Sequence, residues 1–110
     1  MIRDTIGKIE EQIRGSAAIK EESKSELLNL LATLKQEMDS LSQTHVEDAQ
    51  SIAGFTEVSA HEATRQTKSP ELLELSLKGL SSSASGFERS HPELVRAVNA
   101  FCTALANLGV

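Results

Sequence analysis

Aliphatic side chains recur every three or four residues along most of this 110-residue sequence, which is the spacing of one face of an α-helix. At the start, Ile2, Ile6, Ile9 and Ile13 have this spacing, and Gly15 follows them as a helix-ending residue. Proline, which breaks helices, occurs only twice. The pattern therefore predicts a chain made of helices and short connections.

Longer stripes of the same kind occupy residues 27–41 and the last forty residues of the chain. Ser23 and Glu26 match a capping box, so the second helix is expected to begin there and to run to Thr44 or His45. The large side chains of these stripes are called the seam, and we expect them to form the interaction surface between helices. The seam comprises Leu27, Leu31, Leu34, Met38, Leu41, Leu73, Leu77, Leu80, Phe87, Leu94, Val98, Phe101 and Leu105.

The middle of the chain, residues 46–66, keeps the helical spacing with smaller side chains. Ile52, Phe55 and Val58 lie off its stripe, and Gly54 weakens the helix by about 1 kcal/mol relative to alanine. We expect a helix here, within a segment 46–68 that has the character of an insertion. Its stripe comprises Val46, Ala49, Ala53, Thr56, Ala60 and Ala63.

Two proline sites predict where the later helices begin. Ser69 is placed to cap a helix that has Pro70 at its first position. Ser90 and Glu93 match a second capping box, and Pro92 disfavours helical backbone angles at the residue before it. We therefore expect a break before residue 92 and a separate last helix over 92–107, although the stripes on either side share one heptad phase.

The segment 71–90 also carries a strip of small residues beside its leucines. Small side chains let two helices approach closely, so this strip predicts a contact surface within the chain or between copies. The alternative is that the strip faces water. It comprises Ser76, Gly79, Ser83, Gly86 and Ser90.

Composition narrows the fold class. Aromatic residues make up only 3% of the chain, and each normally contributes about 150–250 Å² of burial to a core. Small aliphatic side chains suit the narrow contact between long helices better than a broad core. We expect a single all-α domain over 1–110, an antiparallel helical hairpin or bundle with coiled-coil-like seams, completed by oligomerisation into a dimer or larger assembly.

Charge and hydropathy exclude several classes of partner. The net charge is −5, whereas binding nucleic acid takes clustered Lys and Arg. No uninterrupted apolar run exceeds three residues, far short of the roughly 20 that a membrane-spanning helix needs. The start of the sequence passes directly into charged residues rather than a signal peptide, and one cysteine cannot form an internal disulfide. We expect a cytoplasmic protein with no nucleic-acid or membrane partner.

Candidate catalytic and metal-binding residues are few. Glu88 and His91 have the spacing of half a carboxylate-bridged di-metal site, but such a site needs two such motifs. His45 and His61 would lie about 24 Å apart on one helix, at 1.5 Å per residue. Cys102 lies among Ala and Phe with no cationic neighbour to activate its thiol. The sequence predicts no enzyme, no cofactor and no metal site.

The end of the chain resembles a family of short bacterial helical proteins that is catalogued as a domain of unknown function. The resemblance rests on the stretch 86–94, Gly-Phe-Glu-Arg-Ser-His-Pro-Glu-Leu, and on 103–110, which ends Leu-Ala-Asn-Leu-Gly-Val. The leucine-rich segment 26–41 also resembles the first half of that family. Together these cover about half of the chain. The resemblance implies a small helical bacterial protein and implies no activity.

Two hypotheses about function follow. The first is a self-associating structural or protein-interaction module, with a possible further protein partner. The alternative is a regulatory or ligand-binding module whose interior or groove accepts a partner helix or a small apolar molecule. The apolar stripes are compatible with both, and the assembly state discriminates between them.

Overall fold

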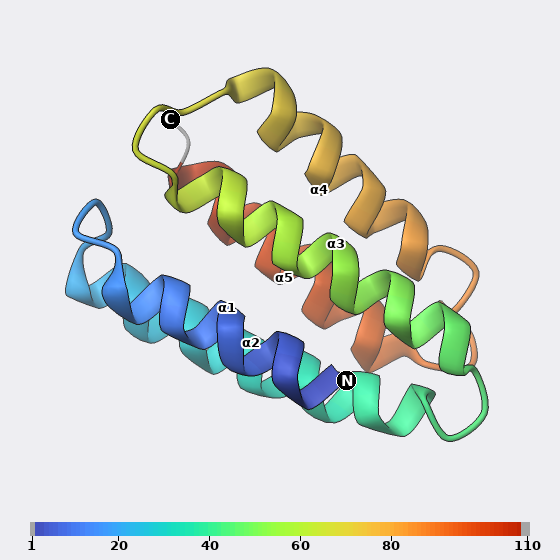
Figure 1. Cartoon of the computed structure of the whole chain (residues 1–110). Helices are drawn as coiled ribbons and strands as arrows, with labels where there is room; N and C mark the ends of the chain where they lie inside the picture. The colour runs from blue at the N-terminus through green and yellow to red at the C-terminus, as the bar shows by residue number, and fades with distance from the viewer. Residues whose placement is uncertain (1, 109–110) are drawn as a thin grey trace.

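The computed structural model describes residues 2–108 and consists of five helices joined by short connections, with no strand in that range (Figure 1). The all-α prediction is confirmed. The helices are α1 (Ile2–Gly15), α2 (Glu21–Leu41), α3 (Val46–Thr64), α4 (Pro70–Ala84) and α5 (Pro92–Leu108).

Successive helices run antiparallel to one another, in an up-and-down bundle (Figure 1). The helices α1, α2, α5 and α3 form a closed ring in which each packs against the next, and α3 also packs against α2 across it. The remaining helix, α4, packs against α3 and α5 and against no other helix in the described range. It is therefore the outermost helix of the bundle.

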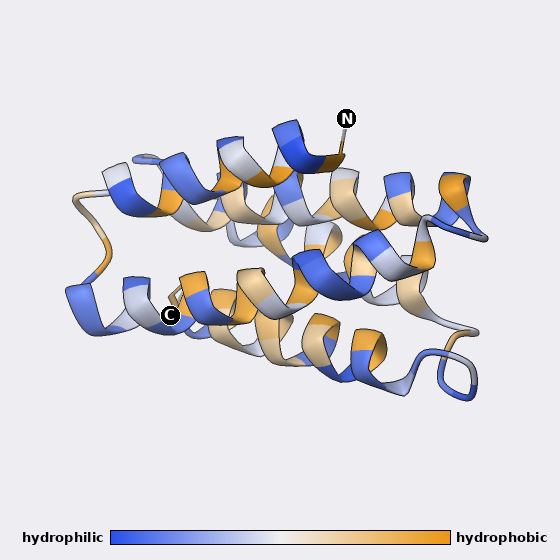
Figure 2. Ribbon diagram, turned by 90° about the horizontal axis from the view of Figure 1, so that it is seen from below, coloured by the Kyte–Doolittle hydropathy of each residue, from blue (hydrophilic) through white to orange (hydrophobic). Residues whose placement is uncertain are grey.

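The core is aliphatic, as the composition predicts, and the hydrophobic side of each helix is turned toward its neighbours (Figure 2). Eleven of the thirteen seam residues are buried, and the other two, Leu77 and Phe87, are partly buried against the core. Phe101 is the only buried aromatic side chain among residues 2–108. The seam thus packs helices of one chain together, and a single copy closes its own core.

The small residues of α3 are buried because this helix contacts all four others. Its buried surface is wider than the predicted stripe: Ile52, expected to lie off the stripe, is fully buried. Val46, expected on the stripe, is exposed because it occupies the first position of the helix. Phe55 and Val58 lie outside the core, as their positions predicted.

The start and end of α2 differ from the prediction. The helix begins at Glu21 after Lys20, so Ser23 lies inside the first turn and cannot serve as its cap. Two acidic residues, Glu21 and Glu22, stabilise this earlier start through the positive end of the helix dipole. The helix ends at Leu41 rather than at Thr44 or His45, because its last carbonyls accept hydrogen bonds from the backbone amides of a tight turn over 42–45.

The cap predicted for α4 is confirmed: the Ser69 hydroxyl accepts a hydrogen bond from the Leu72 amide (3.3 Å), and Pro70 begins the helix. The helix ends at Ala84, however, and does not continue to residue 90. Gly86 has φ +100°, in the left-handed region that favours glycine, and its amide donates to Glu88 Oε2 (2.7 Å). This turn ends α4 earlier than the spacing suggested.

The break before residue 92 is confirmed, since residues 85–91 separate α4 from α5. The capping box predicted from Ser90 and Glu93 is wrong: Pro92 is the first helical residue, so His91, and not Ser90, precedes the helix. The Glu93 carboxylate instead pairs with Arg96 (2.9 Å). The predicted C-terminal cap at Gly109 and Val110 lies outside the described residues.

The strip of small residues on α4 is a contact surface within the chain over part of its length. Ser76 is buried, and Gly79 and Ser83 are partly buried. A Cβ atom at Gly79 would overlap the ring of Phe55 on α3. The absence of a side chain at Gly79 therefore lets this ring lie against the backbone of α4. Gly86 and Ser90 are exposed and lie beyond the end of the helix.

Replacing Leu34 with aspartate is expected to unfold the protein. Leu34 is fully buried in the aliphatic core, and an unpaired charge there costs several kcal/mol. The exposed Ala32 on the same helix provides a control, because Ala32→Asp leaves the core intact. Circular dichroism melts of both variants test this. A Leu34→Asp protein with unchanged helicity and melting temperature would contradict the core described here.

Replacing Gly79 and Ser83 together with leucine is expected to destabilise the protein by about 1–3 kcal/mol, the usual cost of overpacking a close contact. The exposed Ser82 on the same helix gives the control Ser82→Leu, expected to change stability by less than about 0.5 kcal/mol. Chemical denaturation measures both. A double variant as stable as the control would show that the strip tolerates bulk.

Candidate functional site

The outer helix α4 separates two apolar surfaces. Over the boundary with α3, four large side chains remain substantially exposed, and we call this group the outer patch. Its members are Phe55 (40% exposed), Val58 (47%), Leu72 (45%) and Leu75 (57%). Scattered exposed aliphatic side chains are ordinary, whereas a cluster of large ones on one face typically marks a contact surface.

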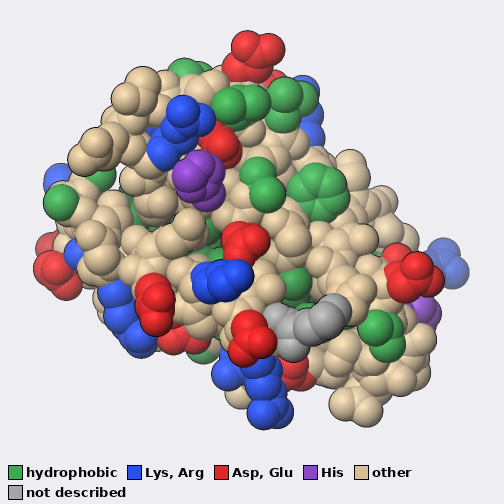
Figure 3. Space-filling view, in the orientation of Figure 1, with side chains coloured by type: hydrophobic (Ala, Val, Ile, Leu, Met, Phe, Trp, Pro, Cys, Tyr) green, Lys and Arg blue, Asp and Glu red, His purple; other side chains and the backbone are tan. Residues whose placement is uncertain are grey.

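Charged side chains lie at the margins of the outer patch and not within it (Figure 3). Near the C-terminal end of α3, the buried carboxylate of Glu62 accepts a hydrogen bond from Arg65 Nη1 (2.9 Å). On α4, Lys78 Nζ pairs with Glu74 (3.1 Å). Apolar side chains at the centre with paired charges at the rim are the arrangement of a protein–protein contact.

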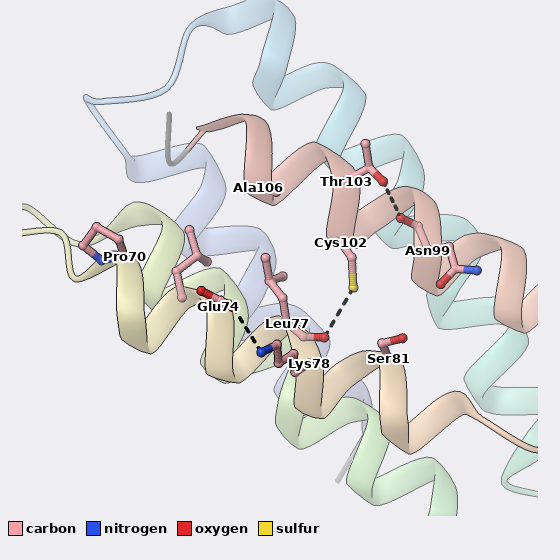
Figure 4. Close-up of a pocket in the computed structure, with 10 residues that line it drawn as sticks. Pro70, Glu74, Leu77, Lys78, Ser81, Asn99, Cys102, Thr103 and Ala106 are labelled. Atoms are coloured by element: carbon pink, nitrogen blue, oxygen red, sulfur yellow. Dashed lines mark hydrogen bonds and ion pairs between the residues drawn. The ribbon is translucent and has the colours of Figure 1, made fainter.

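On its other side, α4 forms an open groove with α5, of about 540 Å³. Leucine side chains of α4 form its floor together with Cys102 and Ala106 of α5, while Asn99 and Thr103 stand at its α5 edge (Figure 4). The lining residues are Pro70, Leu73, Glu74, Leu77, Lys78, Ser81, Asn99, Cys102, Thr103 and Ala106.

The one cysteine lies in this groove and is not activated. Burial raises the pKa of the Cys102 thiol to about 11, and its Sγ–H donates to the Leu77 carbonyl oxygen (3.9 Å). A thiol becomes nucleophilic when a cationic neighbour or a helix N-terminus lowers its pKa, and the shift here is in the opposite direction. Cys102 therefore behaves as a small apolar lining residue.

His45 and His61 lie near opposite ends of α3, as their spacing predicted. His61 is on the exposed side of α3, whereas His45 and His91 meet at the end of the bundle, where both also contact Phe87. The ring centroids are 5.3 Å apart for His45 and Phe87, 5.8 Å for Phe87 and His91, and 6.3 Å for the two histidines. These edge-to-face contacts link the α2–α3 turn to the α4–α5 connection.

The Glu88 and His91 motif is part of a turn. Glu88 accepts the Gly86 amide, and His91 Nδ1 lies 3.0 Å from the Ser90 hydroxyl. Within residues 2–108, no group of three or more His, Cys, Asp or Glu side chains is arranged to hold a metal ion. In the same range no helix combines the length and hydrophobicity required to cross a membrane.

Sequence reasoning placed the interaction surface at the seam, which the structure buries, and did not single out the outer patch. Its signal was present in part: Phe55 and Val58 are large residues off the stripe of α3, and Leu72 and Leu75 are off the stripe of α4. Large apolar side chains outside the stripes are the sequence signal of this patch.

Comparison of the chain with family models, with curated proteins and with solved structures finds no match. The resemblance to a bacterial family of unknown function therefore stays a prediction.

The raised pKa of Cys102 predicts slow alkylation. At about pH 8, iodoacetamide is expected to react with it on the order of a hundredfold more slowly than with a free cysteine, whose pKa is about 8.5, because the thiolate is the reactive form. The rate should rise with pH up to about 11. Mass spectrometry of the alkylated chain measures it, with the denatured protein as control. A rate that levels off near pH 8.5 in the folded protein would contradict this burial.

Proposed function

We propose that this protein is a protein-interaction module that self-associates through the outer patch. The observation that carries the proposal is the clustering of four large, exposed apolar side chains, two from α3 and two from α4, on a face whose charges lie at its rim. Exposed apolar surface of this kind gains free energy when another protein removes it from water.

The outer patch supports this function better than the seam does. The seam residues are committed to contacts within the chain, so they are unavailable to a partner unless the fold opens. The outer patch needs no rearrangement, because its side chains already lie at the surface of α3 and α4.

The expected association is weak. Fully burying a large aliphatic or aromatic side chain yields about 1.5–3 kcal/mol, and these side chains are about half exposed, so each copy contributes roughly 3–6 kcal/mol. Association itself costs about 4–15 kcal/mol in lost motion. The burial free energy of the patches of two copies together therefore exceeds the lower part of this cost. Such a small net gain favours an assembly that is reversible and depends on concentration.

Sedimentation velocity at two protein concentrations tests the proposal. The natural protein is expected to shift toward a larger species at the higher concentration, and Val58→Asp combined with Leu75→Asp should abolish the shift by charging the patch. Ser82→Asp, exposed on the same helix but outside the patch, should leave it intact. Circular dichroism checks that both variants fold like the natural protein.

Either of two results would overturn the proposal. One is a natural protein that sediments as a monomer at every concentration. The other is an assembly that the doubly charged variant retains.

The groove between α4 and α5 favours a second candidate function, the binding of a small apolar molecule. Its volume is within the range of about 300–1,000 Å³ typical of ligand sites, and its floor is apolar with a few polar groups at the edge. A monomeric protein in which an apolar fluorescent probe shields Cys102 from alkylation would favour this function over self-association.

A further inference from the structure

We propose that the partner at the outer patch is a second copy of this chain, docked face to face about a two-fold axis that crosses α3 and α4 at the level of Val58 and Leu75. The proposal rests on the proposed function and specifies the arrangement of the two copies. In it, α4 of one copy lies antiparallel to α4 of the other, and the two α3 helices face each other in the same way.

The first argument is the register of the patch. In the antiparallel pair, α3 ends at Thr64 and α4 begins at Pro70, so Leu75, five residues into α4, is level with a position five residues before the end of α3. Val58 lies one residue from that position, a displacement of about 1.5 Å. The contact of Phe55 with Gly79 gives the same register. The two central side chains of the patch are therefore side by side on one line across the helices.

A two-fold axis along that line would bring like side chains together. Val58 would meet Val58 of the partner subunit, and Leu75 would meet Leu75 of the partner subunit. An interface of this kind is self-complementary only if the residues on the axis tolerate contact with themselves. Apolar side chains meet this condition, whereas charged ones would repel.

The second argument is charge complementarity on α4. Glu71 is four residues before Leu75 and Lys78 is three residues after it. Rotation about an axis at Leu75 places Lys78 level with the partner's Leu72, about 1.5 Å along the helix from the partner's Glu71. Glu71 forms no ion pair with any described residue of its own chain. Lys78 pairs with Glu74 of its own chain (3.1 Å), so the symmetric interface would place each Lys78 ammonium between Glu74 and the partner's Glu71, at two equivalent positions.

The third argument is the flatness of the surface beside the patch on α3. Gly54 and Ser51 are exposed there and are small, and nothing lies within 4 Å of the Cβ position of Gly54. The exposed surface of α3 beside Phe55 and Val58 is therefore formed in part by small residues. Small side chains beside the patch let two such faces approach closely around the large side chains at the centre.

Disulfide trapping tests the position of the axis. Leu75→Cys in a Cys102→Ala background should form a covalent dimer with oxidised glutathione, because the two introduced thiols meet at the axis. Ser82→Cys in the same background is the matched control. Its two thiols would be separated by fourteen residues, or about 21 Å along the antiparallel pair, beyond the reach of a disulfide. Non-reducing electrophoresis reads out both.

Charge reversal tests the antiparallel direction. Glu71→Lys alone should weaken the dimer about threefold to tenfold, since it opposes two cations at two symmetric positions. Adding Lys78→Glu to that variant should restore the affinity of the natural protein. Sedimentation velocity measures both, and circular dichroism confirms the fold.

The outcomes separate the arrangement from the proposed function. Self-association without trapping at residue 75, or without rescue by the double reversal, would overturn the two-fold arrangement and leave the interaction module standing. Absence of self-association in the natural protein would overturn both.

Discussion

The packing of α3 against all four other helices is the constraint on which the rest of the structure depends. It is possible because the buried positions of α3 are mostly small, including Ala49, Ala53, Ala60 and Ala63. Short side chains let neighbouring helices approach a central one from several directions. A chain with almost no aromatic residues can therefore close a core: its aliphatic residues fill a narrow space between closely packed helices, with Phe101 as the one large ring.

The position of α4 follows from that arrangement. Once α1, α2, α5 and α3 have formed a ring, α4 can cover only the outer side of α3 and α5. A helix covered on one side needs a single apolar stripe, yet α4 carries leucines beyond it, at positions 72 and 75. The additional leucines Leu72 and Leu75 therefore form an exposed apolar surface. It lies next to Phe55, whose ring reaches α4 because Gly79 has no side chain.

Periodicity predicted the helices well, since the spacing of the stripes is a local property that each helix retains on packing. It predicted ends less well: the serines at 23 and 90 each precede a glutamate at the capping distance, yet neither is a cap. The outer patch could be predicted only in part, because periodicity shows which large apolar residues lie off a stripe but not how many neighbours a helix has. The meeting of His45 with His91 depends likewise on which connections share one end of the bundle.

Because the core is completed within one chain, the proposed self-association is not required for folding. In an obligate dimer the partner supplies missing core, so folding and assembly are one equilibrium and stability depends on concentration. Here Leu34 and most other seam residues are buried without a partner, whereas Val58 and Leu75 are about half exposed. Folding is therefore separable from the proposed association: a charge in the core disrupts the monomer, whereas a charge on the outer patch leaves the monomer folded. An interface of this kind can be weak and reversible, since the monomer that dissociates from it remains folded.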